Sequence, residues 1–386
     1  PYLLKIETDL DYGGDFHGQD GPILVKRHPL NSLTDDQLAF YEACKYLGYK
    51  ENMDHNLPDA TGVGPYPLNN PDGIRFSTAL GYLSQSRHRL NLTIKPNCVT
   101  RKIIFDGNIA TGVEVISGDE IFKVEGKEII LSAGSIATPQ ILMLSGVGSE
   151  ELLSAFDISV ISDLPGVGKN LRDHPTVHTT WKPHFSFNKP EQKIGPQKVA
   201  LRYTSQDSKY QNDMIMIMRF SHEIGDAGAL MISVGIYLAE SVGRISLQST
   251  DIHMQPILDY NLLSHKYDLK RLREGVRLAD KIAEAPSFTD SIVARLSPDE
   301  TTINNDDLLD QWMLENVLTM HHISGTCKMG PKSDKEAVVD QYGLVYGTKQ
   351  LRIADASILP DCPRANTNVA AMLIGERIAD FIKTSD

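Results

Sequence analysis

Residues 128–144 constrain the fold more than any other part of the sequence. Residues 128–131 form a short strand pattern that is apolar on both faces, and a turn of small residues follows at Gly134. Residues 137–144 then have the composition of a helix. A buried strand that enters a helix through a small-residue turn is typical of α/β architecture. The uncharged run 130–149 is interrupted by glycine and proline, so it does not predict a membrane span.

Two other stretches predict antiparallel sheet. The first, residues 91–132, contains short strand patterns separated by Asp106-Gly107 and Ser117-Gly118, which are typical tight-turn pairs, so we expect a β-meander. The second, residues 176–265, predicts one larger sheet. Its methionine-rich run suits a binding face or the core, and core is the simpler interpretation. The predicted strands are 92–94, 101–105, 110–116, 121–124, 214–218, 230–238 and 244–247, and the predicted helices are 35–46, 268–283 and 369–382.

Composition excludes several classes of function. The chain has 386 residues, with 38 basic and 50 acidic side chains and a formal net charge of −12, which argues against nucleic acid or an acidic membrane as a partner. Its four cysteines show no paired spacing, so neither a zinc site nor a disulfide framework is indicated. The first residues lack the pattern of a signal peptide. We therefore expect a cytoplasmic protein with free thiols and no membrane span.

Two short segments carry the residue types of a reaction centre. Asn366, Thr367 and Asn368 precede the last predicted helix, whose N-terminus offers unpaired amides and a positive dipole end to an anionic group, although an ordinary capped helix explains the same pattern. His321 and His322 lie in a loop of small and hydroxyl residues, where one histidine is a candidate base. Neighbouring side chains diverge and no further ligand is suitably spaced, so no metal site is predicted.

Four motifs, in order along the chain, resemble those of the glucose–methanol–choline (GMC) oxidoreductases. Residues 134–148 resemble the family's second signature, and residues 165–175 resemble the segment that leads into its substrate domain. The loop around His322, followed by Gly-Thr-Cys-Lys-Met-Gly, resembles the active-site loop of the choline-dehydrogenase-like branch. Residues 351–376 resemble the C-terminal flavin segment.

The resemblance implies an FAD enzyme that oxidises the CH–OH group of an alcohol to a carbonyl by hydride transfer to the flavin N5. His322 matches the family's catalytic histidine and Asn366 its partner; His321 ranks well below His322. The flavin-binding positions that match are Val99, Ala133, Gly134, Asp355, Ala356, Thr367 and Asn368. Their chemistry fits: a neutral imidazole can remove the hydroxyl proton, and an amide can hold the oxygen as its charge develops.

The same resemblance divides the chain into four predicted segments. Residues 1–87 are a loop-rich cap at the substrate cleft, and residues 88–175 are part of the FAD-binding α/β domain, with the meander. Residues 176–320 are the antiparallel-sheet substrate domain, and residues 321–386 complete the FAD-binding domain and carry the active site. The fold class is therefore mixed α/β (α+β), with a small-molecule alcohol as the expected ligand.

One departure from the family pattern affects the expected assembly. The family opens with a strand, a GxGxxG turn and a helix that binds the FAD pyrophosphate, and this glycine pattern does not occur in the sequence. We therefore expect the chain to be the C-terminal part of a GMC enzyme, with a second chain or segment that supplies the dinucleotide-binding half. Two other functions remain open: a non-redox flavoprotein such as a hydroxynitrile lyase, and a non-catalytic remnant.

Overall fold

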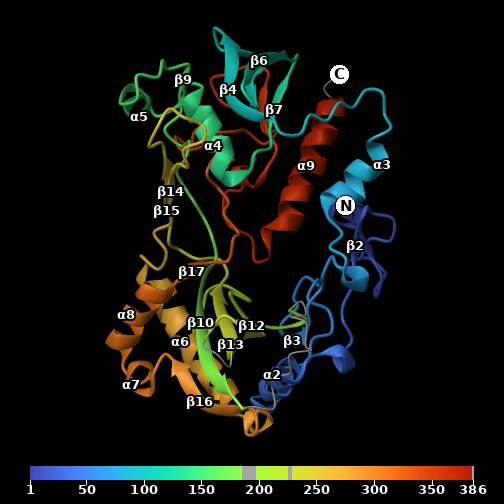
Figure 1. Ribbon diagram of the computed structural model, residues 1–386, viewed down its shortest axis with the longest axis vertical. Helices are drawn as coiled ribbons and strands as arrows, with labels where there is room; N and C mark the ends of the chain where they lie inside the picture. Colours follow the sequence, from blue (N-terminus) through green and yellow to red (C-terminus); the bar gives the residue numbers. More distant parts are fainter. Residues whose placement is uncertain (185–196, 225–227, 385–386) are drawn as a thin grey trace.

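The computed structural model describes residues 1–184, 197–224 and 228–384, which form two lobes (Figure 1). One lobe holds the small meander, helix α4 (Gly134–Leu144) and helix α9 (Thr367–Thr384); the other is built on a large antiparallel sheet. The N-terminal end of α9 points toward that sheet (Figure 1). The prediction of a mixed α/β fold with a meander and an antiparallel-sheet domain is confirmed.

The large sheet has seven strands, all antiparallel, in the order β16-β10-β13-β12-β11-β3, with β17 paired to β10. Its outermost strand β3 comes from the first 87 residues of the chain, so the N-terminal segment contributes a strand to the large sheet. The strands are β3 (Gly62–Pro65), β10 (Pro175–Pro183), β11 (Val199–Tyr203), β12 (Met214–Ser221), β13 (Ala229–Ile236), β16 (Ile292–Ser297) and β17 (Leu318–Thr319).

The two faces of this sheet have different neighbours because side chains alternate along a strand. One face carries Met214, Met216 and Met218 into the main hydrophobic core, which the helices α2 (Asp35–Tyr46) and α6 (Lys266–Ala283) cover, so the methionine run is core. The opposite face carries a smaller cluster on which Tyr66 and Met320 pack. That smaller cluster is the face that the candidate site uses; its buried members are Ala200, Ile215, Ile217 and Tyr237.

The other lobe is built around a parallel strand pair. Strand β7 (Ile129–Leu131) pairs with β18 (Leu351–Ile353), and both strands lead into glycine- and alanine-containing turns at their carboxyl ends. Helices α4 and α9 pack here around a second hydrophobic core. The meander of β4 (Val99–Asp106), β5 (Ile109–Ser117) and β6 (Glu120–Glu125) forms a separate three-stranded sheet, as predicted.

Short elements complete the fold. Helix α1 (Tyr2–Ile6) packs on α9, and the parallel pair β1 (Glu7–Asp9) and β2 (Ile23–Val25) follows it. The remaining helices and strands are α3 (Ser84–Ser86), α5 (Glu150–Ser154), α7 (Glu300–Ile303), α8 (Asp306–Asn316), β8 (Val147–Gly148), β9 (Ser162–Asp163), β14 (Arg244–Ser246) and β15 (Ile257–Asp259). Single turns of other helix types lie at Leu30–Ser32, Pro71–Gly73, Ala79–Leu83, Pro286–Phe288 and Ala356–Ile358.

Three local predictions were wrong. Residues 92–94 form no strand, because they lie in an exposed loop before the meander. Strand β14 pairs with β15 in a two-stranded sheet of its own instead of joining the large sheet. The pattern around β7 predicts a strand buried on both faces, but Ile130 is 44% exposed. Within the described residues β7 pairs with β18 alone, so its other edge has no neighbouring strand.

None of the helices in the described ranges combines the length and the apolar composition that a bilayer span requires. The segment boundaries at residues 87, 175 and 320 remain predictions.

Candidate active site

His322 lies in the loop after β17, where its ring meets a second buried histidine. Its Nδ1 atom is 2.9 Å from Nδ1 of His174, and the two rings cross at 75°. His174 immediately precedes β10, and both side chains are buried. The carboxylate of Asp173 fixes both backbones, because its Oδ1 atom accepts hydrogen bonds from the amides of His174 and His322. We refer to His174 and His322 as the histidine pair.

Burial determines the protonation of the histidine pair. It lowers the pKa of His322 to about 4, with a smaller contribution from the neighbouring His321. It lowers the pKa of His174 to about 3. Burial also raises the pKa of Asp173, which its hydrogen bonds with Thr319 and the two amides oppose. Both rings are therefore neutral near pH 7, which is the state that a proton acceptor requires.

Asn366 precedes the first residue of α9 and is exposed. Its Oδ1 atom accepts a short hydrogen bond from the hydroxyl of Tyr66, a residue just beyond β3. Tyr66 is in turn hydrogen-bonded to the fully buried Tyr237, and burial raises the pKa of both phenols. The ring of Tyr237 packs against His174, with 4.5 Å between the ring centroids.

The two predicted catalytic residues are thus joined through one continuous network. It runs from His322 to His174, then through the rings of Tyr237 and Tyr66, to Asn366. His174, Tyr237, Tyr66 and His322 lie at the ends of strands of the large sheet, whereas Asn366 directly precedes α9 of the other lobe. The site therefore lies where the two lobes meet. The catalytic roles of His322 and Asn366 remain proposals.

Four of the predicted cofactor residues lie at the carboxyl ends of the parallel strands β7 and β18. The Asp355 carboxylate accepts hydrogen bonds from the amide of Gly134 at 3.0 Å, from the hydroxyl of Thr138 at 2.6 Å and from the amide of Ser357 at 2.8 Å. The Asp355 carboxylate therefore connects, by hydrogen bonds, the two turns that contain Ala133 and Ala356. Ligands of α/β sheets bind at this edge, outside the carboxyl ends of the strands.

The other predicted cofactor residues lie on exposed elements. Thr367 and Asn368 form the first turn of α9, where helix amides have no partner inside the helix. Val99 is the first residue of β4, with 39% of its surface exposed. No described contact joins Val99 to the Asp355 cluster, so its place beside the adenine remains a prediction.

Sequence reasoning missed His174, Tyr66 and Tyr237. His174 lies within residues 165–175, which resemble a family segment, so its position between an aspartate and a proline was a usable signal. Tyr66 and Tyr237 had none, because their contacts with Asn366 and His174 join residues far apart in the chain.

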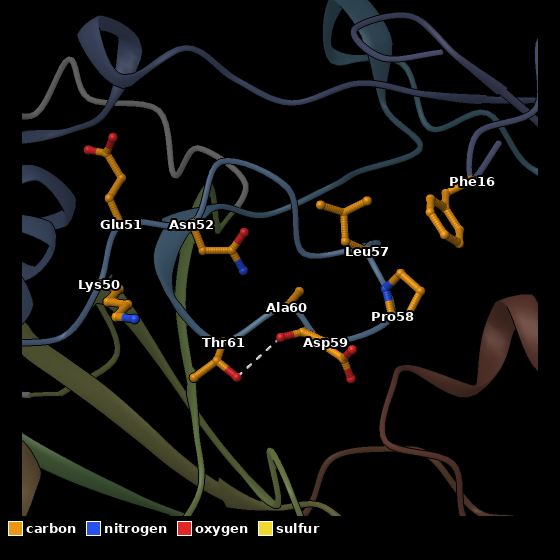
Figure 2. A pocket seen from close by; sticks show the side chains of 9 residues that line it. All are labelled: Phe16, Lys50, Glu51, Asn52, Leu57, Pro58, Asp59, Ala60 and Thr61. Atoms are coloured by element: carbon orange, nitrogen blue, oxygen red, sulfur yellow. Dashed lines mark hydrogen bonds between the residues drawn. The ribbon is translucent and has the colours of Figure 1, made fainter. Parts of the chain in front are cut away.

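An open hollow lies elsewhere, in the loop that precedes β3. Figure 2 shows its lining, which includes Phe16 at one side and residues 57–61 along its floor. The hydroxyl of Thr61 contacts the Asp59 carbonyl and the side chain of Asn212, which hold the floor in place. None of the candidate site residues lines this hollow, so we assign it no part in the chemistry.

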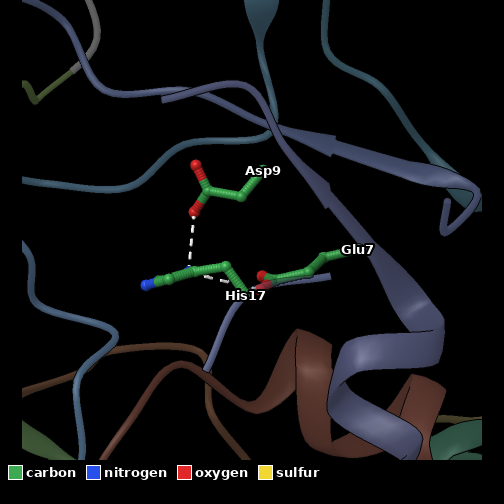
Figure 3. Close-up of side chains that lie close together, drawn as sticks. All are labelled: Glu7, Asp9 and His17. Atoms are coloured by element: carbon green, nitrogen blue, oxygen red, sulfur yellow. Dashed lines mark ion pairs between the residues drawn. The ribbon is translucent and has the colours of Figure 1, made fainter. Parts of the chain in front are cut away.

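Glu7, Asp9 and His17 offer ligand atoms within 4.8 Å of one another (Figure 3). However, the guanidinium of Arg27 binds both oxygens of Asp9 at 2.8–2.9 Å and also pairs with Asp54 at 2.6 Å. The cation that a buried carboxylate cluster requires is thus supplied by the chain itself. We describe this group as an ion-pair cluster that ties β1 to the loop after α2.

Comparison with known proteins identifies the family of the chain. Two family models described as GMC oxidoreductase match the chain, the N-terminal one over residues 2–176 and the C-terminal one over residues 239–375. An oxygen-dependent choline dehydrogenase of Escherichia coli is 34% identical over 421 aligned positions, which cover 100% of this chain and 74% of that protein.

Solved structures show the same fold. Pyridoxine 4-oxidase from Mesorbium loti superposes with a TM-score of 0.89 at 26% identity, over 99% of this chain and 76% of the other. An FAD-dependent oxidoreductase from Chaetomium thermophilum superposes with a TM-score of 0.88 at 22% identity, over 100% of this chain and 80% of the other. At this identity the likeness shows the fold alone.

The match of the N-terminal family model over residues 2–176 corrects one prediction. We expected a chain that lacks the N-terminal part of the family and a second chain that supplies it; this is wrong, because the chain carries sequence of both family models.

The residues present fit a flavin. Gly134 has a φ of +85° and open space where a side chain would begin, so its turn leaves room for a ligand backbone. The N-terminal end of α9 points toward the large sheet (Figure 1), and Asn366 directly before it is joined to the histidine pair through Tyr66 and Tyr237. Together, the four motifs, the network around His322 and the two matching models lead to one conclusion: the chain belongs to the GMC oxidoreductase family, whose cofactor is FAD.

Proposed function

We propose that this protein oxidises a primary or secondary alcohol to the corresponding carbonyl compound. His322 takes the hydroxyl proton and Asn366 holds the oxygen. FAD, when bound, supplies the acceptor for the hydride that leaves the alcohol carbon. The observation that carries the proposal is the network from His322 to Asn366, because it connects a neutral buried imidazole with an exposed amide at the junction of the two lobes.

The orientation of His322 supports its role as base. Its Nδ1 atom is occupied by His174, so Nε2 is the ring nitrogen left for a substrate. The low pKa, about 4, keeps the ring neutral across the physiological range, as a proton acceptor requires. A positioned general base of this kind typically contributes about 10²–10⁴-fold in rate.

The orientation of Asn366 supports its role as hydrogen-bond donor. Because the Tyr66 hydroxyl donates to Oδ1, the amide N–H groups are left to face a ligand. Such a donor stabilises an oxygen whose negative charge grows as its proton leaves. The positive end of the α9 dipole, next to Asn366, favours an anionic group in the same region.

The charges on the sheet favour an uncharged substrate over a quaternary ammonium such as choline. Arg202 and Arg219 occupy the alternating positions of the face that carries Ile215 and Ile217. Within the described ranges neither guanidinium forms an ion pair with a carboxylate; Arg202 instead donates to the carbonyls of His55 and Arg364. A cationic substrate would meet these charges at low dielectric. We therefore propose a neutral alcohol.

The test is anaerobic mixing of the FAD-loaded protein with a panel of neutral primary and secondary alcohols, followed by flavin absorbance. We expect bleaching with at least one alcohol. His322→Asn should slow that bleaching about 10²–10⁴-fold. The matched control is His321→Asn, because His321 is exposed, adjacent to His322 and at a φ of +62° that asparagine tolerates. The flavin of this variant should bleach at close to the wild-type rate. A His322→Asn protein that bleaches at the wild-type rate, or flavin that stays oxidised with every alcohol, would contradict the proposal.

A further inference from the structure

The contact between the two rings of the histidine pair has a chemical consequence. Two nitrogens of the same kind, Nδ1 of each ring, lie 2.9 Å apart inside the protein. A neutral imidazole has one protonated nitrogen and one with a free lone pair. Since burial keeps both rings neutral, one Nδ1 must donate and the other must accept. The direction of this hydrogen bond fixes the tautomer of His322.

Only one direction leaves His322 able to act as a base. If His322 donates through Nδ1–H, its Nε2 keeps a lone pair for the hydroxyl proton of a substrate. If His174 donates instead, Nε2 of His322 carries the hydrogen and the ring becomes a donor. The tautomer of His174 thus decides whether His322 can take a proton.

The surroundings of His174 favour the productive direction. Its Nε2 atom is buried and makes no regular hydrogen bond within the described residues. The carbonyl of Pro363 raises the pKa of the ring against the effect of burial, and because Nδ1 faces His322, we place the proton that this acceptor favours on Nε2. A proton on Nε2 leaves Nδ1 of His174 as the acceptor. Packing against Tyr237 and the Asp173 bond to its amide hold the ring in this place.

The other groups that face the pair are polar but already occupied. The Asp173 carboxylate accepts from Thr319 and from two amides, and the Cys362 thiol donates to the His322 carbonyl at 3.5 Å. His321, in the same loop as His322, lowers the pKa of His322 further by an electrostatic interaction. Within the described residues, His174 is therefore the one hydrogen-bond partner of the His322 ring.

We propose that His174 is a positioning residue that holds His322 in the tautomer with Nδ1 protonated and Nε2 free. The inference rests on the proposed function of His322. In the reaction the O–H bond of the alcohol breaks and an N–H bond forms at Nε2 of His322. The Nδ1–H of His322 stays bonded to Nδ1 of His174, which shares the positive charge of the resulting imidazolium.

The direct test is ¹⁵N NMR of the oxidised, FAD-loaded protein with labelled histidine, with His322→Asn and His174→Asn spectra to assign the signals. The wild-type spectrum should show His322 with Nδ1 protonated and Nε2 unprotonated. In His174→Ala the Nε2-protonated tautomer should become substantial. A wild-type His322 that carries its proton on Nε2 overturns the inference without any variant.

Kinetics supply the second readout. His174→Ala should lower kcat about 10–100-fold, part of the general-base contribution, with little change in KM or in flavin content. His174→Asn should recover a large share of this loss, because its side-chain oxygen can accept from His322 near the position of Nδ1. It also keeps a polar side chain if alanine prevents folding.

The outcomes separate the two claims. Wild-type kcat and an unchanged His322 tautomer in both His174 variants would refute the role of His174 and leave that of His322 intact. Wild-type flavin reduction in His322→Asn would instead remove the proposed function on which the inference rests.

Discussion

Tyr66→Phe removes one oxygen atom from the middle of the network. That hydroxyl donates to Oδ1 of Asn366 and is hydrogen-bonded to the phenol of Tyr237. Phenylalanine keeps the ring and its packing on the sheet face. The change therefore tests whether the orientation of the Asn366 amide matters for catalysis.

The structure sets the size of the effect. Tyr237 is 1% exposed, so its O–H group would lose a buried partner, at a cost of about 1–3 kcal/mol in the free energy of unfolding. Asn366 is exposed, so water can replace the lost donor, but the amide becomes free to rotate. Complete loss of an oxyanion donor costs about 10²–10³-fold in kcat. Loss of orientation alone, worth one neutral hydrogen bond of roughly 1 kcal/mol, should lower kcat about fivefold.

The assay is stopped-flow flavin reduction together with urea unfolding. Tyr46→Phe is the control, because Tyr46 is 69% exposed and its hydroxyl has no partner in the described structure; both measurements should match wild type. Asn366→Ala sets the upper limit of the kinetic loss. If Tyr66→Phe reduces its flavin as fast as wild type while Asn366→Ala is slow, the orientation argument is refuted.

Three further predictions follow from burial, charge and packing. Choline should be oxidised at least tenfold less efficiently than its uncharged isostere 3,3-dimethylbutan-1-ol, measured as kcat/KM, because Arg202 adds a positive charge to the sheet face on which we propose that the substrate binds; equal values would refute the charge argument. The histidine pair is neutral when folded, with pKa values of about 3 and about 4 against an unfolded value near 6.5, so the unfolded chain binds more protons below pH 6.5. Each histidine should then cost about 1.4 kcal/mol per pH unit as the pH falls from 6.5 toward 4; urea midpoints that stay constant from pH 7 to 5 would contradict this. Gly275→Ala should destabilise the fold by about 1–3 kcal/mol, because its Cβ would lie 2.6 Å from Val234 and 2.9 Å from Met214, whereas Gly375→Ala, with open space, should be neutral or stabilising by up to about 1 kcal/mol in thermal unfolding.

Local patterns predicted the local structure well. The helix at 35–46 has the predicted bounds, and the helices predicted at 268–283 and 369–382 begin two residues earlier in the structure. Turn chemistry likewise located the meander. These features depend on residues close together in the sequence, which is why periodicity and turn residues are enough.

Long-range pairing was not predictable in the same way. The pattern of residues 244–247 correctly predicts a strand. The alternation of polar and apolar residues does not determine its partner strand, and in the structure β14 pairs with β15. The contact of Tyr66 with Asn366 spans 300 positions, and that of His174 with His322 spans 148. The motifs named the two candidate catalytic residues, whereas the groups that orient them follow from tertiary packing alone.

A structure of the FAD-loaded protein with an unreactive analogue of a turned-over alcohol tests the central claim most directly. The analogue hydroxyl should lie about 2.6–3.2 Å from both Nε2 of His322 and Nδ2 of Asn366. A hydroxyl bound out of reach of either atom would contradict the account.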